Sequence, residues 1–246
     1  MSFAGKRYWL VGASEGLGLA LAQALSREGA EVILSARSAE GLAVACAGVP
    51  RSRSVLVDVA DSASVTRAAQ AVGDIDGLVF LAGVYWPMTA QAVDAGQLET
   101  MCNINFTGCA RLVAAVLPAM VARGAGHLVL TGSLSGFRGL PGAVGYAASK
   151  AGVMALAESL YADLRGSGIK VQLANPGFIR TRLTAKNDFA MPFLMEPEAA
   201  AAAMLRLMQS DRFKANFPTV FSWLFRGGQF LPDWLYYRLF APRRGA

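Results

Sequence analysis

A tyrosine and a lysine four residues apart, with a serine upstream, form the group of side chains best suited to acid/base chemistry. Tyr146 and Lys150 lie in a segment predicted to be helical, where positions i and i+4 share one face. A phenol has a reference pKa of about 10, and a neighbouring ammonium lowers it toward neutrality by stabilising the phenolate. Ser133 lies 13 residues upstream, at the end of a predicted strand, where its hydroxyl can hold a substrate oxygen. We therefore expect Tyr146 to exchange a proton with that oxygen.

A glycine-rich turn after the first predicted strand is suited to holding a phosphate group. Glycines at such a turn let the backbone approach a pyrophosphate at the N-terminus of the next helix. The spacing Gly-x3-Gly-x-Gly differs from the general G-x-G-x-x-G fingerprint, so the turn alone is equally compatible with close packing of strand and helix. The expected contacts are Gly12, Ser14, Glu15, Gly16, Leu17 and Gly18.

The residues at the ends of the second and third predicted strands indicate which dinucleotide this turn would bind. Arg37 stands where an acidic residue would bind a ribose 2′-hydroxyl, and its guanidinium can instead hold a 2′-phosphate together with Ser14. This favours NADP(H) and leaves NAD(H) open, since Arg37 could also be an ordinary exposed arginine. Asp58, followed by Val59, is placed either to accept a hydrogen bond from the adenine amino group or to cap the next helix.

These residues require strands that end at one edge of a sheet. Short apolar strands are predicted at 8–11, 31–36, 54–59, 77–83, 127–133 and 170–177, and they alternate with helices at 39–47, 61–72, 94–123 and 145–166 and one after the glycine turn. The alternation predicts a single α/β domain, a Rossmann-type doubly wound parallel β-sheet with helices on both faces. We expect residues 1–185 to form the NADP(H)-binding catalytic core, and residues 186–246 to form a substrate lid and an aromatic, basic C-terminal extension.

The motifs, in this order, resemble the short-chain dehydrogenase/reductase family over residues 5 to about 185. They are Gly12-x3-Gly16-x-Gly18, Asp58, Asn105, Ser133, Tyr146-x3-Lys150 and Asn175-Pro176-Gly177. The resemblance implies that Tyr146 is the general acid/base and that Ser133 orients a carbonyl. It also implies that Lys150 binds the nicotinamide ribose and lowers the tyrosine pKa, and that Asn105 holds a water in a proton relay. Further cofactor contacts are implied at Ala82, Gly83, Tyr146, Lys150, Pro176, Gly177, Ile179 and Thr181.

Two positions depart from the family pattern. The usual Asn-Asn-Ala-Gly is here Phe80-Leu81-Ala82-Gly83, and the usual threonine that opens the glycine motif is Val11. The small Ala-Gly pair is kept. We expect apolar packing to replace the lost polar bracing, with the chemistry intact.

The resemblance implies reversible, NADP(H)-dependent hydride transfer between the nicotinamide and a carbonyl or secondary alcohol. A lid at 184–196 rich in Phe and Met favours a hydrophobic small molecule. One alternative is a ketoacyl-carrier-protein reductase, which the long aromatic tail disfavours. Another is a non-catalytic NADP(H)-sensing protein, which the complete catalytic group disfavours. The resemblance also implies a homodimer or homotetramer formed through the helices at 94–123 and 145–166.

Composition limits the remaining possibilities. No apolar run approaching the 18 or so residues of a membrane span is evident, and three cysteines and one histidine offer no metal-ligand spacing, so we expect a cytoplasmic protein without a metal site. Residues 201–246 carry seven basic and two acidic side chains, but these lie among bulky apolar residues and do not indicate nucleic-acid binding. For the aromatic residues of 213–246 three roles stay open: packing on the core or a partner subunit, a substrate entrance, or peripheral contact with a membrane.

Overall fold

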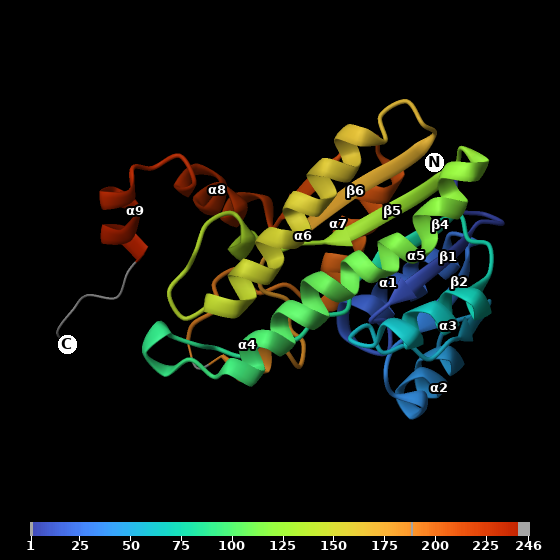
Figure 1. Ribbon diagram of the computed structural model, residues 1–246, viewed down its shortest axis with the longest axis horizontal. Helices are drawn as coiled ribbons and strands as arrows, with labels where there is room; N and C mark the ends of the chain where they lie inside the picture. Colours follow the sequence, from blue (N-terminus) through green and yellow to red (C-terminus); the bar gives the residue numbers. More distant parts are fainter. Residues whose placement is uncertain (1, 188, 241–246) are drawn as a thin grey trace.

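A seven-stranded parallel sheet forms the centre of the protein (Figure 1). The computed structural model describes residues 2–187 and 189–240. In chain order the strands are Arg7–Val11 (β1), Glu31–Ser35 (β2), Ser52–Ser54 (β3), Gly77–Phe80 (β4), Gly126–Thr131 (β5), Ile169–Pro176 (β6) and Lys214–Phe217 (β7). Their spatial order is β3-β2-β1-β4-β5-β6-β7. The direction of winding reverses between β1 and β4, and ligands bind sheets of this kind at the carboxyl ends of the strands beside such a point.

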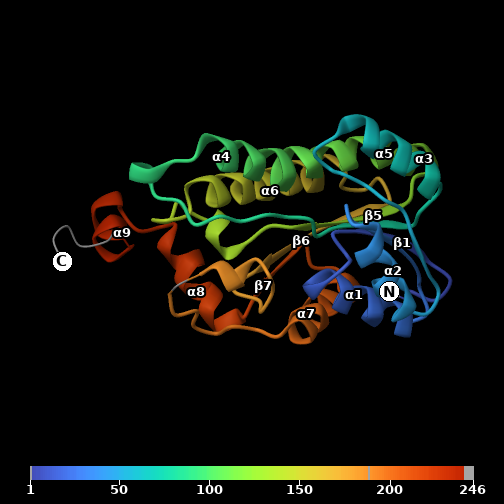
Figure 2. The ribbon, with the colours of Figure 1, turned by 90° about the horizontal axis from the view of Figure 1, so that it is seen from below.

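Helices cover both faces of the sheet (Figure 2). One layer holds α3 (Ser62–Val72), α4 (Ala95–Met101), α5 (Gly108–Arg123) and α6 (Val144–Asp163). The other holds α1 (Gly16–Arg27), α2 (Ala39–Ala47) and α7 (Pro197–Gln209). Each layer shares its own apolar core with the sheet, and Phe80 and Leu10, fully buried, belong to opposite cores. The predicted single-domain, Rossmann-type fold is confirmed.

The third strand is shorter than predicted and begins earlier, at Ser52 instead of residue 54. The chain nevertheless follows β2 further, because Val55 N donates to Leu34 O at 3.0 Å and Val57 N donates to Ala36 O at 3.1 Å. Leu56, between them, is 55% exposed, as befits a segment at the edge of a sheet. The backbone therefore still carries Val57 and the residues after it to the carboxyl edge.

Much of the expected extension after residue 185 lies within the core layers. Helix α7 packs against α1, and β7 pairs in parallel with β6, so that Leu173 lies beside Lys214 and Pro176 beside Phe217. Residue 185 is therefore not a boundary of the sheet. In this extension, α8 (Thr219–Gly228) and α9 (Asp233–Phe240) stand beyond the end of the sheet, with α9 the more distant (Figure 1).

One continuous helical run, Ala95–Arg123, is long and apolar enough to cross a membrane, contrary to our expectation from the sequence. It arises because α4, a π-helical turn at Cys102–Thr107 and α5 follow one another without a break. Leu112, Val116 and Met120 on this run belong to the hydrophobic core. We therefore interpret the run as a core helix of the α/β domain.

Candidate active site

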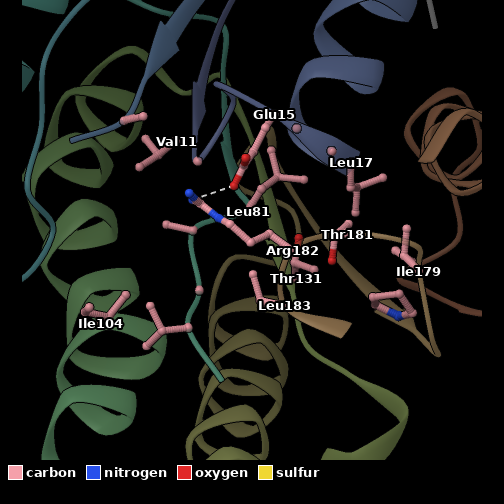
Figure 3. A pocket seen from close by; sticks show the side chains of 18 of the residues that line it. Val11, Glu15, Leu17, Leu81, Ile104, Thr131, Ile179, Thr181, Arg182 and Leu183 are labelled. Carbon is pink, nitrogen blue, oxygen red and sulfur yellow. Dashed lines mark ion pairs between the residues drawn. The ribbon is translucent and has the colours of Figure 1, made fainter. Parts of the chain in front are cut away.

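A pocket opens at the carboxyl edge of the sheet, between the glycine turn and the segment that follows β6 (Figure 3). Most residues expected to contact a cofactor line it. They are Gly12, Ser14, Glu15, Gly16, Leu17, Gly18, Arg37, Val59, Ala82, Gly83, Tyr146, Lys150, Pro176, Gly177, Ile179 and Thr181. Asp58, Asn105 and Ser133 are not among the lining residues.

The glycine turn has the shape of a cradle that side chains would fill. Gly12 adopts a φ of +91°, and a Cβ there would lie 2.5 Å from the backbone N of Ala82. A Cβ on Gly18 would collide with the carbonyl of Gly12. Glu15 precedes α1, but its side chain does not accept a capping hydrogen bond from the first N–H groups of the helix. The positive end of the α1 dipole therefore faces the pocket without a partner from Glu15. A dinucleotide pyrophosphate fits this cradle, and Gly12, Gly16 and Gly18 would let it approach the backbone.

Arg37 and Asp58 have different surroundings. Arg37 is exposed and lines the pocket just beyond the end of β2. The Asp58 carboxylate accepts a hydrogen bond from Ala60 N at 2.9 Å. The helix cap of α3 is Asp61, whose Oδ1 accepts from Ala63 N at 2.9 Å. The capping alternative for Asp58 is therefore wrong, and its contact with adenine stays a prediction.

Lys150 and Tyr146 come together on the first turns of α6, beneath the pocket. Lys150 is buried, and its Nζ donates to the carbonyl oxygen of Thr131 at 2.9 Å. The same Nζ lies 5.8 Å from the centre of the Tyr146 ring. Burial lowers the pKa of Lys150 to about 8, while the nearby Cys109 acts weakly in the opposite direction.

Tyr146 shows the opposite shift. Burial raises its pKa to about 12, a hydrogen bond with Ser133 lowers it, and the neighbouring Tyr85 raises it. The Tyr85 and Tyr146 rings meet edge to face with centroids 5.0 Å apart. The expected lowering of the tyrosine pKa by Lys150 is thus not found in this arrangement, because burial outweighs the other influences.

Ser133 stands at the end of β5, where its hydroxyl bonds with both Tyr146 and the next turn. Its Oγ lies 2.9 Å from Ser135 Oγ and accepts from Ser135 N at 3.2 Å. Ser133 is buried behind the pocket wall. The three side chains of the predicted acid/base group therefore lie together, with the hydroxyls of Ser133 and Tyr146 hydrogen-bonded to each other and the Lys150 ammonium beside the Tyr146 ring.

Asn105 occupies the π-helical turn between α4 and α5 and is fully buried. Its Oδ1 accepts from Val84 N at 2.8 Å, and its Nδ2 donates to Val84 O and to Ser149 Oγ, each at 3.0 Å. Turns of this kind occur frequently at functional sites. Here the turn aims the amide at the loop after β4 and at α6, one residue before Lys150, so Asn105 braces the two segments that flank Tyr146.

Aromatic side chains surround the approach to this point. Lys186 donates from Nζ to the carbonyl oxygen of Tyr85 at 2.9 Å, and its ammonium lies 4.3 Å from the Trp86 ring centre. The expected lid is thus attached to the loop after β4. A second group, which we call the aromatic cluster, connects the lid to α8 through ring contacts. It consists of Phe178, Phe189, Phe193, Phe221 and Phe225.

Several pocket residues escaped the sequence analysis. Arg182 forms an ion pair with Glu15 at 2.6 Å across the pocket (Figure 3). The Thr184 hydroxyl donates to Ile179 O at 2.6 Å and accepts from Thr181 N at 3.0 Å, which shapes the turn after β6. Arg182 directly follows the predicted contact Thr181 and Thr184 lies three residues after it, so their proximity in the chain was the available signal. Thr131 and Tyr85 each lie two residues from a predicted site residue, but their contacts with Lys150 and Tyr146 depend on how α6 packs.

The two departures from the family pattern are apolar and buried. Phe80 and Val11 both belong to the core beside α3 and α5. Apolar packing therefore takes the place of the polar bracing at these two positions.

Comparisons with known proteins agree with this architecture. The short chain dehydrogenase family model matches residues 6–191. An oxidoreductase of Myxococcus xanthus is 37% identical over 236 residues, 92% of this chain and 93% of its own. A ketoacyl reductase of a Nostoc species is 31% identical over 84% of this chain and 76% of its own. A short chain dehydrogenase from Burkholderia cenocepacia, solved in complex with NADP, superposes with a TM-score of 0.87 at 25% identity, covering 98% of this chain and all of that one. The chain thus belongs to the short-chain dehydrogenase/reductase family of NAD(P)-dependent oxidoreductases.

Proposed function

We propose that this enzyme uses NADP(H) to interconvert a hydrophobic carbonyl compound and the corresponding secondary alcohol. The convergence of Ser133, Tyr146 and Lys150 beside the pocket carries the proposal. The cofactor supplies the hydride, and the protein supplies position and proton control.

In the reducing direction, the hydroxyls of Ser133 and Tyr146 donate hydrogen bonds to the substrate carbonyl oxygen. Tyr146 then transfers its proton to that oxygen as charge develops there. The raised pKa of Tyr146 keeps the phenol protonated across the physiological range, as a proton donor must be. Lys150 stabilises the resulting phenolate by its charge. Asn105 fixes the loop after β4 against α6 and holds the relay water in the role that the family resemblance implies.

The preference for NADP(H) rests on Arg37. Its guanidinium is exposed at the pocket edge beyond β2, and a 2′-phosphate bound there would gain charge-assisted hydrogen bonds. Asp58, the nearby acid, already accepts a hydrogen bond from the backbone. NAD(H), which lacks that phosphate, would gain nothing from Arg37.

The substrate class follows from the aromatic cluster. Gly177 lines the pocket, and a Cβ on it would lie 3.3 Å from Phe221, so the cluster begins at the pocket wall. Phe189 and Phe193 extend it to the surface and are half exposed. An alkyl or aryl chain attached to the carbonyl could cover these rings and remove apolar surface from water.

A ketoacyl group on a carrier is the second candidate, because a relative is a ketoacyl reductase. The two candidates differ in what the entrance must recognise. A free hydrophobic ketone or aldehyde needs only the aromatic cluster, whereas a carrier protein needs a complementary surface around the entrance.

Turnover across a series of aldehydes and ketones of increasing chain length, with NADPH and NADH in parallel, tests the proposal. We expect kcat/KM with NADPH to rise with chain length, and the double variant F189S/F193S to lose that rise while keeping its rate on the shortest substrates. V93S, at an exposed valine outside the cluster, is the matched control. Turnover of carrier-bound ketoacyl groups alone would favour the second candidate. Inert protein that still binds NADPH would favour a sensing role.

We also place this activity in the cytoplasm, in a homodimer or homotetramer formed through α5 and α6. Val121, Val144 and Tyr161 are exposed apolar residues on these helices and could be covered in such an assembly. A monomeric mass in light scattering would contradict the assembly.

A further inference from the structure

Helices α8 and α9, with the turn between them, expose several large apolar side chains to solvent. Trp223 is 63% exposed, Phe230 82% and Trp234 69%. We call this set the C-terminal apolar face; its members are Val220, Trp223, Leu224, Phe230, Trp234, Tyr237 and Leu239. Scattered single apolar residues are normal on protein surfaces, but a group of them gathered on one segment points to an interaction site.

The inner sides of these two helices are already satisfied by other aromatic residues. In α8, Phe221 and Phe225 belong to the aromatic cluster, so that helix is apolar on both sides. In α9, Tyr236 is buried and stacks on Phe240 with ring centroids 4.6 Å apart. A helix with apolar residues all round is normally covered on every side. Within the described residues, no other part of the chain covers the exposed side of these two helices.

Arg138 fixes the position of the two helices. Its guanidinium donates to Gly228 O at 3.1 Å and to Leu231 O at 2.7 Å, and lies 4.0 Å from the centre of the Tyr236 ring. It also forms an ion pair with Asp233, the acidic residue at the start of α9. These contacts hold α8 and α9 together, and both ribbon views show the two helices beyond the end of the sheet (Figures 1 and 2).

The charge on this surface is positive. The pairing with Arg138 neutralises Asp233, while Arg226 and Arg238 have no acidic partner among the described residues. The guanidinium of Arg226 lies 5.1 Å from the Trp223 ring centre, so a cation and an indole occupy the same patch. The sequence after α9 adds Arg243 and Arg244, which lie outside the described residues.

We propose that the C-terminal apolar face docks on an anionic lipid surface. Trp and Tyr side chains concentrate at the level of lipid headgroups, and arginines interspersed among them are attracted to anionic lipids. A second copy of the chain fits less well, because a symmetric contact would bring the same unpaired arginines face to face. The glycine turn and the catalytic residues lie on other elements, so docking through this face would not cover them. It would also place the entrance near a source of hydrophobic carbonyl compounds.

Flotation with vesicles of phosphatidylcholine alone, or with phosphatidylserine added, tests the proposal on the full chain. We expect binding to the anionic vesicles, a large loss with salt, and a blue shift of tryptophan emission on binding. Trp9 is fully buried, so the exposed tryptophans would carry that shift. The variants W223S/W234S and R226Q/R238Q should each lower vesicle partitioning by about tenfold or more.

V44S/L56S, which removes two equally exposed apolar residues elsewhere, is the matched control and should bind like the wild type. Circular dichroism and NADPH binding of each variant show that it is folded. Wild-type protein that ignores both kinds of vesicle would overturn the proposal. Variants that lower the molecular mass in light scattering without changing vesicle binding would also overturn it, and would assign the face to a second copy.

Discussion

The ammonium of Lys150 donates its hydrogen bond to the carbonyl oxygen of Thr131, at 2.9 Å, and not to the phenol of Tyr146. Because Thr131 ends β5 and Lys150 lies on α6, this bond fixes the catalytic helix against the strand that ends two residues before Ser133. Lys150 therefore acts on Tyr146 through its position and its charge. Loss of this positive charge should therefore lower the catalytic activity even when the protein stays folded.

The charge of Lys150 predicts an alkaline limit for carbonyl reduction. Burial lowers the pKa of this lysine to about 8, so the ammonium is present below that pH and is lost above it. We expect kcat/KM for reduction with NADPH to be level below pH 8 and to fall by up to tenfold for each further pH unit. The exposed lysine variant K214M should show the same profile. A profile that stays level to pH 10 would contradict this role for Lys150.

Replacement of Arg37 should separate the two cofactors. In R37A the 2′-phosphate would lose a charge-assisted partner, so we expect the Kd for NADPH to rise about 10- to 100-fold and the Kd for NADH to stay the same. Fluorescence titration without substrate measures both constants. The exposed arginine variant R27A is the control. An equal rise of the Kd for NADPH and the Kd for NADH in R37A would show that Arg37 does not bind the 2′-phosphate.

Removal of the Asn105 amide should cost stability as well as activity. N105A would leave the N–H and carbonyl of Val84 without their side-chain partner in a partly buried position, which costs about 1–3 kcal/mol of unfolding free energy. Urea unfolding measures this loss. Asn103, whose Oδ1 accepts from Arg111 instead, provides the control variant N103A. If N103A lost as much stability as N105A, the bracing role assigned to Asn105 would be incorrect.

The single histidine predicts how stability changes with mild acid. His127 is buried between Tyr8 and Gln172, with ring nitrogens 2.8 Å from Tyr8 Oη and 2.9 Å from Gln172 Oε1. Burial lowers its pKa to about 4, against about 6.5 in the unfolded chain. The unfolded state therefore binds more protons between these values, and stability falls as pH drops below 6.5, by about 3 kcal/mol in all at pH 4.

Chemical denaturation at a series of pH values checks this expectation. Between pH 5 and 6.5 the slope should be present in the wild type and absent in H127Q, since the chain has no other histidine. Asp76, whose pKa is lowered, affects stability only at more acidic pH, so it does not contribute to the slope between pH 5 and 6.5. A wild-type stability independent of pH between 5 and 6.5 would refute the assignment.

The sequence predicted the five inner strands because their residues are apolar on both faces, and it placed the polar edge strand β3 two residues too late. It did not predict β7, whose four residues Lys-Ala-Asn-Phe show neither a continuous apolar run nor clear alternation. That strand forms because β6 offers it a free edge, which is a tertiary effect. The π-helical turn that holds Asn105 was likewise invisible, since a single extra residue in a helix leaves no mark on apolar periodicity.

The candidate site could be predicted as a list of residues but not as a network. Motif spacing indicated Tyr146, Lys150 and Ser133, and the structure brings them together. The bond from Lys150 to Thr131 and the ion pair between Glu15 and Arg182 depend on how β5, α6 and the segment after β6 are placed. The raised pKa of Tyr146 also depends on burial, which no local pattern reveals.

The most direct test of the central claim is the single-turnover oxidation of NADPH by wild-type protein and Y146F, with a hydrophobic aldehyde that the wild type accepts. The account predicts that Y146F, when saturated with NADPH, transfers hydride at least about 100-fold more slowly than the wild type, because the proton donor is gone. Hydride transfer by Y146F at the wild-type rate, with NADPH bound equally well, would contradict the assignment of Tyr146 as the catalytic acid.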